Sequence, residues 1–208
     1  MQPSVNPATP APAPAFTPSW SLFTPSMEAL QFNLGTLMLL IFGPLLLVAA
    51  LALSAVGDAF LSRDGEQAFL GGLASFLAAH ILYVPLFLRS GGGLDVLGTE
   101  TWRGAIALAM AAFVVVMLAA LWRRVGPGLR VPIAVYIAAI LAMGISALTL
   151  DNPWVIAGAV LFMASDGLLA TEKFLVPAIA PYRAGIRYAV WVLYYAAQLA
   201  ITLGFLLG

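Results

Sequence analysis

The chain has 208 residues, of which 62% are hydrophobic and only 9% are charged, and its net charge is zero. Because soluble domains average about 25% charged residues, this composition indicates an integral membrane protein. The absence of a basic tract excludes nucleic acid as an expected partner. The absence of cysteine and the presence of one histidine exclude disulfides, thiolate chemistry and sites built from several imidazoles. We therefore expect no metal site and no cofactor.

The N-terminal residues 1–27 contain seven of the fourteen prolines, many alanines and no basic residue. A secretory signal needs a positively charged start, so this segment is not one. Repeated proline and alanine favour an extended, disordered tail. The sequence therefore predicts a disordered tail over residues 1–27 and a membrane-embedded helical domain over residues 28–208.

Six stretches are apolar and long enough for a membrane-spanning helix, which needs about 20 residues. They are residues 44–62, 67–88, 102–122, 131–150, 153–172 and 185–207. The apolar segment before residue 44 either extends the first span past a kink at Gly43 and Pro44 or forms a seventh span, and we favour the extension. The sequence thus predicts an all-α, polytopic membrane helical bundle.

The basic residues are divided unequally between the two ends of these spans. Seven of the nine lie near residues 63–66, 123–130 and 173–184, whereas Arg89 and Arg103 lie at the other end. Cytoplasmic loops carry the excess of Lys and Arg, so the three loops are predicted to be cytoplasmic and the N-terminus to lie outside. Arginine outnumbers lysine eight to one, and alanine, glycine and proline abound, which suggests a GC-rich bacterial genome and hence a bacterial inner membrane.

Two aspartates lie inside predicted spans, where a carboxylate costs roughly 2.5–3.5 kcal/mol and marks a functional site by default. Asp58 lies five residues before Arg63, and Asp166 lies seven residues before Lys173, both on inward-running helices. At 1.5 Å per residue, both carboxyl groups lie about 7–11 Å below the same membrane boundary. This shared depth predicts that the two acids meet in one site.

Two carboxyl groups in a medium of low dielectric constant can divide the work of acid catalysis. One keeps its proton and acts as an acid, while the other stabilises positive charge or orients water. Glycoside hydrolysis through an oxocarbenium-like transition state works in this way. No G-x-S-x-G sequence for ester hydrolysis is present. The pair therefore fits an acid-labile vinyl ether better than an ordinary ester.

Other polar side chains lie at similar depths. Tyr136 and Tyr194 reach the level of the aspartates, and Gln198 lies one helical turn beyond Tyr194 on the same face. Tyrosines at this level often belong to an interfacial belt, and a glutamine can simply bridge two helices. His80, with Tyr83 one turn further on, lies nearer the middle of the bilayer, where a lone histidine is more often a packing residue.

Four strings in order carry a family resemblance: "SAVGDAFLS" (54–62), "FLAAHILYVPLF" (76–87), "AGAVLFMASDGLLATEKF" (157–174) and "YYAAQLAITLG" (194–204). The chain resembles the YhhN-type lysoplasmalogenases, in which a GD helix, an H-x-x-Y helix, an SD-x-x-x-A helix and a closing helix with Tyr and Gln recur. The resemblance implies a multi-pass hydrolase that cleaves the vinyl ether of lysoplasmalogens to a fatty aldehyde and a glycerophospho-base.

Carried over by motif position, the resemblance implies that Asp58 and Asp166 are the catalytic carboxylates. It implies that His80, Tyr83, Tyr194 and Gln198 line the substrate site, and the depth of Tyr136 adds this tyrosine to the substrate-binding candidates. The expected partners are a lysophospholipid, entering sideways from the inner leaflet, and membrane lipids.

Two other functions remain open from the residues alone. Membrane carboxylates also relay protons in transporters, so the chain could be a proton-coupled carrier of a small molecule. It could also be a non-catalytic lipid-binding protein in which the aspartates only pair helices. Arg63 is poorly placed to pair with Asp58 on the same helix, which disfavours this last interpretation.

Overall fold

The structure, a computed structural model, describes residues 27–207, with side chains from residue 41 on. These residues form seven helices and no strand, which confirms the predicted all-α class. Six of the seven are long and apolar enough to cross a membrane. The tail predicted over residues 1–27 lies outside the described residues, except for Met27.

The helices are α1 (Met27–Leu61), α2 (Glu66–Ser90), α3 (Val96–Thr99), α4 (Thr101–Trp122), α5 (Pro127–Ala147), α6 (Pro153–Phe174) and α7 (Arg183–Leu207). All six predicted spans are found, and the short α3 is an addition. The first helix continues through Pro44, so the segment before this proline extends the first span as expected, and its apolar span is Ile41–Leu61. The chain divides into two units after residue 38, and the bundle belongs to the second.

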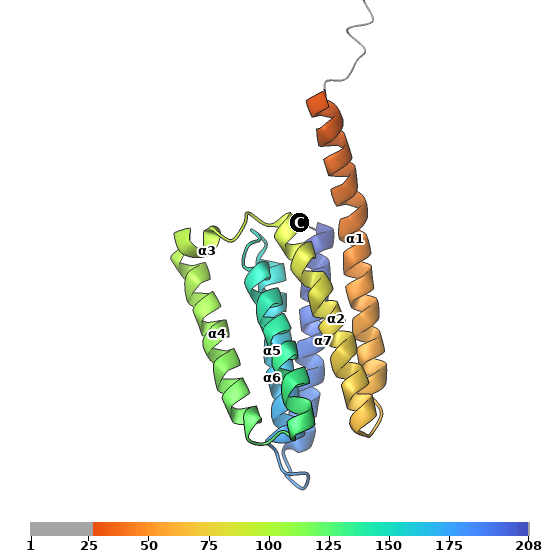
Figure 1. The fold of residues 1–208 in the computed structure, drawn as a ribbon, viewed down its shortest axis with the longest axis vertical. Coiled ribbons are helices and arrows are strands. Elements are labelled where there is room, and N and C mark those ends of the chain that lie inside the picture. The colour runs from red at the N-terminus through yellow and green to blue at the C-terminus, as the bar shows by residue number, and fades with distance from the viewer. Residues whose placement is uncertain (1–26, 208) are drawn as a thin grey trace, which may run out of the picture. The chain divides into compact units, whose positions relative to one another are not determined.

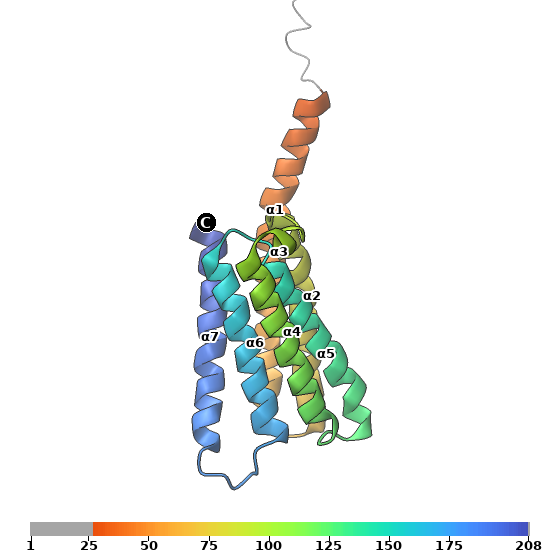
Figure 2. The ribbon, with the colours of Figure 1, turned by 90° about the vertical axis from the view of Figure 1, so that its left-hand side faces the viewer.

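Consecutive long helices of the bundle run in opposite directions, as Figures 1 and 2 show. The loops 62–65, 123–126 and 175–182 therefore lie together at the lower end of Figure 1. Seven of the nine basic residues lie at or next to this end. The positive-inside rule predicts that the lower end is cytoplasmic.

Helices α6 and α7 pack closely against each other. Two glycines allow this approach: a Cβ at Gly158 would lie 2.6 Å from Ile201 Cγ1, and one at Gly204 would lie 2.7 Å from Val155 Cγ2. Small residues let helix backbones come close in a membrane, where packing rather than hydrophobic burial drives association. The pairing fixes which residues of α6 face α7.

Asn152 sets the relative position of the same two helices. Its side-chain oxygen accepts hydrogen bonds from the backbone N–H groups of Trp154 (3.0 Å) and Val155 (3.3 Å), which caps the N-terminus of α6. Its amide nitrogen donates to the carbonyl of Gly204 in the last turn of α7 (2.8 Å). One side chain thus begins one helix and holds the end of the other.

A buried arginine connects α4 to the α5–α6 loop at the upper end of Figure 1. Arg103 is 3% exposed, and its Nη1 donates to the carbonyls of Leu148 (2.6 Å) and Leu150 (2.8 Å). Its Nε donates to Glu100 at 2.7 Å, and its Nη2 donates to Asp151. These bonds satisfy a guanidinium that would otherwise be costly to bury.

We expect Arg103→Gln to lower the stability of the bundle by about 2 kcal/mol or more, because it leaves buried carbonyl groups without donors. Thermal unfolding of the purified protein in detergent measures the loss. Arg89→Gln is the matched control, since Arg89 is an exposed arginine at the same end of the bundle. Equal unfolding temperatures for the two variants would contradict the anchoring role.

Candidate active site

Both predicted aspartates line one cavity of about 310 Å³. Asp58 comes from the last turn of α1 and Asp166 from the second half of α6, and α2 and α7 complete the wall. A volume of this size lies at the lower end of the range for small-molecule sites, about 300–1,000 Å³. The structure therefore brings together two acids from distant parts of the chain, as their common depth predicts.

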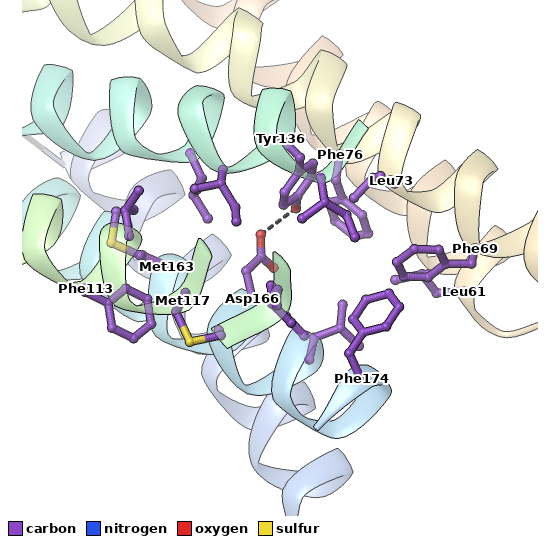
Figure 3. A pocket seen from close by; sticks show the side chains of 18 residues that line it. Leu61, Phe69, Leu73, Phe76, Phe113, Met117, Tyr136, Met163, Asp166 and Phe174 are labelled. Atoms are coloured by element: carbon purple, nitrogen blue, oxygen red, sulfur yellow. Dashed lines mark hydrogen bonds between the residues drawn. The ribbon is translucent and has the colours of Figure 1, made fainter. Parts of the chain in front are cut away.

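A second, apolar cavity of about 70 Å³ lies beside the first. Figure 3 shows its wall, in which rings and aliphatic chains such as Phe113 and Met117 surround Asp166 and Tyr136, the two polar side chains that line it within residues 41–207. The two cavities share five lining residues: Leu61, Phe69, Phe76, Asp166 and Leu169. Asp166 therefore stands where a polar space meets an apolar one.

The carboxyl group of Asp166 is held from α5. The Tyr136 hydroxyl donates a hydrogen bond to it, drawn as the dashed line in Figure 3. The edge of the Tyr136 ring in turn packs against His80, with centroids 5.3 Å apart and an interplanar angle of 87°. His80 is fully buried, lines neither cavity, and has no hydrogen-bond partner for either nitrogen among the described residues.

The carboxyl group of Asp58 is supported from α7 through a line of polar groups. It interacts with the Tyr194 hydroxyl, which also lines the larger cavity. The amide nitrogen of Gln198 donates to that hydroxyl at 3.5 Å, and the Tyr83 hydroxyl donates to the amide oxygen of Gln198 at 2.7 Å. Tyr194 thus links Gln198 and Tyr83, which line neither cavity, to the cavity that Asp58 lines.

Each aspartate has a glycine as a chain neighbour, and each glycine lies against an aromatic ring. A Cβ at Gly57 would lie 2.6 Å from the ring of Phe76, and one at Gly167 would lie 2.4 Å from the ring of Phe113. Phe76 lines both cavities and Phe113 lines the apolar one. The glycines in the GD and DG pairs thus let apolar rings close directly beside the acids.

The sequence-predicted site residues fall into two groups. Asp58, Asp166, Tyr136 and Tyr194 line the cavities. The remaining three candidates lie one layer behind them: His80, Tyr83 and Gln198. For these three, contact with a substrate stays a prediction: His80 packs against Tyr136, Gln198 hydrogen-bonds to Tyr194, and Tyr83 hydrogen-bonds to Gln198.

Sequence reasoning missed the charged rim of the larger cavity. The rim residues are Arg63, Asp64, Glu172, Lys173, Arg183 and Arg187. Glu172 and Arg183 form an ion pair between α6 and α7, with Oε1 and Nε 2.5 Å apart. The basic residues entered the sequence argument only as markers of membrane orientation. The sequence signal that could have indicated the rim is the short separation of Arg63 from Asp58 and of Lys173 from Asp166, five and seven residues.

The comparisons with known proteins agree with the motif order. A family model described as "YhhN family" matches residues 23–205. The chain is 35% identical over 166 residues to a protein of Mycobacterium tuberculosis named lysoplasmalogenase. The aligned residues cover 78% of this chain and 60% of that protein. No solved structure matches the chain significantly.

Two mammalian proteins are also similar. Lysoplasmalogenase TMEM86B of Homo sapiens is 34% identical over 160 residues, which cover 76% of this chain and 62% of that protein. Lysoplasmalogenase TMEM86A of Bos taurus is 31% identical over 166 residues, which cover 74% of this chain and 62% of that protein. The chain thus spans about three fifths of the length of the relatives that it matches.

We expect Gly57→Ala to destabilise the protein by about 1–3 kcal/mol, because the new methyl group displaces the Phe76 ring from a packed wall. Gly43→Ala in the same helix is the control, since a Cβ there meets nothing within 4 Å. Thermal unfolding of both variants tests the close approach, and equal unfolding temperatures would show that the ring is free to move.

Proposed function

The chain belongs to the YhhN family, and we propose that it is a membrane hydrolase that cleaves the vinyl-ether bond of lysoplasmalogen-type lysophospholipids. The names of its relatives in Mycobacterium tuberculosis and Homo sapiens support this reaction. The observation that carries the proposal is the presence of Asp58 and Asp166 in the wall of one cavity between helices long and apolar enough to span a membrane. The products are a fatty aldehyde and a glycerophospho-base.

Hydrolysis of a vinyl ether begins with protonation of carbon rather than oxygen. A protonated carboxyl group transfers its proton to the outer carbon of the double bond, and the electron pair of the ether oxygen then forms an oxocarbenium ion. Water adds to the carbon of this ion while the second carboxylate takes the released proton. The resulting hemiacetal then gives its hydroxyl proton to the first carboxylate, the second carboxyl group gives its proton to the glycerol oxygen, and the bond between that oxygen and the aldehyde carbon breaks.

The position of each acid supports a division of roles. Asp166 borders the apolar cavity, where the first carbons of the alkenyl chain are expected, so it lies next to the carbon to be protonated. Asp58 borders only the larger, polar cavity, through which water reaches the ion. We therefore assign Asp166 as the acid and Asp58 as the group that orients water and stabilises positive charge.

The two hydroxyl groups beside the acids orient them. Tyr136 donates to Asp166, and Tyr194 lies between Asp58 and Gln198. The small apolar cavity cannot enclose a long chain, so the remaining carbons extend toward the bilayer, which supports sideways entry of the lipid. We infer a bacterial inner membrane, since arginine outnumbers lysine eight to one and a mycobacterial protein is among the relatives.

We expect Asp58→Asn and Asp166→Asn each to reduce release of long-chain aldehyde from lysoplasmalogen at least 100-fold, because an amide neither donates nor accepts the required proton. Purified protein in detergent micelles, with the aldehyde measured by a coupled dehydrogenase, provides the assay. Asp95→Asn is the control, since Asp95 is an exposed aspartate outside both cavities.

Thermal unfolding of the two variants shows whether the fold is retained. Aldehyde release at the original rate in both folded variants would remove the two-acid mechanism. Proton uptake coupled to a solute in proteoliposomes, without aldehyde release, would instead identify a carrier.

A further inference from the structure

Four basic side chains line the lower end of the cavity that contains the two aspartates. Glu172 neutralises Arg183 through the ion pair between α6 and α7. The other three, Arg63, Lys173 and Arg187, make no ion pair within residues 41–207. These three cations are therefore not directly paired with a described acidic side chain, in a lining that also includes Asp58, Asp64 and Asp166.

The ammonium group of Lys173 is directed toward the cavity rather than away from it. Its Nζ lies 5.2 Å from the centre of the Phe69 ring, which lines both cavities. A cation–π contact of this kind holds a lysine in place without neutralising its charge. Lys173 is thus held at the rim and remains available to an anion.

Not every basic residue at this end of the bundle behaves in this way. Arg123 and Arg124 lie at the same end but line neither of the two cavities. The basic residues of the rim therefore all line the larger cavity, which the positive-inside rule does not require. This difference separates binding from membrane orientation and supplies a matched control.

The spacing between the cations and the acids suits one class of molecule. Lys173 lies seven residues from Asp166 along α6, which corresponds to about 10 Å, and Arg63 lies five residues from Asp58, in the loop that follows α1. In a lysophospholipid, five bonds join the phosphorus to the ether oxygen, and an extended chain advances about 1.2 Å per bond, or roughly 6 Å in all. The flexible Arg and Lys side chains close the remaining distance.

The geometry points to Arg63, Lys173 and Arg187 as the site that binds the phosphate of the lysolipid head group, which makes them specificity-determining residues. This inference rests on the proposed function, because it places the vinyl ether at the aspartates when the phosphate is at the rim. The phosphate binds the cations, the glycerol spans the polar cavity, and the alkenyl chain begins at the apolar cavity. Recognition then requires a phosphate and not only a vinyl ether.

The test compares two substrates with the same alkenyl chain: 1-alkenyl-glycerophosphoethanolamine and 1-alkenylglycerol, which lacks the phosphate. The wild-type protein is expected to prefer the phosphate-bearing substrate at least tenfold in kcat/KM. In Lys173→Gln/Arg187→Gln this preference is expected to fall about tenfold, mainly through a higher KM for the phosphate-bearing substrate. Arg124→Gln, at the same end of the bundle, is expected to keep the preference. An unchanged preference in the double variant, or none in the wild type, would overturn the inference.

A binding measurement separates this inference from the proposed reaction. A tritiated 1-alkyl-glycerophosphoethanolamine has a saturated ether, so it fills the site without the double bond that the reaction needs. We expect the double variant to bind it at least tenfold more weakly than Arg124→Gln. Charge-dependent binding without aldehyde release from either vinyl ether would support the head-group site and refute the proposed function. Aldehyde release with equal binding in both variants would support the proposed function and refute the head-group site.

Two soluble competitors identify the source of the phosphate. Glycerophosphoethanolamine, the head-group product, is expected to displace the tritiated lysolipid at millimolar concentration more effectively than inorganic phosphate does. Equal displacement by inorganic phosphate alone would indicate a site for free phosphate and would overturn assignment to a lipid head group.

Discussion

A carboxyl group inside the hydrocarbon layer must find its polar partners within the protein, and this constraint shapes the bundle around both acids. Lipid offers no hydrogen bonds, so an unpaired polar group there costs several kcal/mol. Asp166 receives the hydroxyl of Tyr136 from α5, and Asp58 is supported by Tyr194 and Gln198 from α7. Each acid therefore requires a neighbouring helix at a defined angle and height: α5 for Asp166 and α7 for Asp58.

An acid that is to react must also keep an open side, which a purely structural hydrogen bond does not need. The two cavities provide it, while at the neighbouring Gly57 and Gly167 the rings of Phe76 and Phe113 lie against bare helix backbone. A carboxyl group and an apolar wall can thus lie within a few ångströms of each other. This arrangement accounts for the division of the site into a polar and an apolar cavity with Asp166 at the junction.

The spans and the common depth of the acids could be predicted because both depend on distance along a helix and on one membrane boundary. The direction in which a side chain points around its helix depends on packing, which the sequence does not state. His80 and Gln198 therefore fell among the lining candidates, although they lie behind Tyr136 and Tyr194. The charged rim was missed for another reason: basic residues at helix ends already had a sufficient explanation in membrane orientation.

Orientation and recognition need not be separate properties of those rim residues. The positive-inside rule places Lys and Arg at the cytoplasmic boundary, and the phosphates of inner-leaflet lipids lie at the same level. A helix that carries an acid one or two turns below a basic end therefore presents both groups at the separation found between the phosphate and the ether of a lysolipid. Of the basic residues at that boundary, only those that also face the cavity can use this match, and Lys173 does so over the Phe69 ring while Arg124 does not. Whether a basic residue at this boundary can bind a phosphate thus depends on how its side chain packs and not on its charge alone.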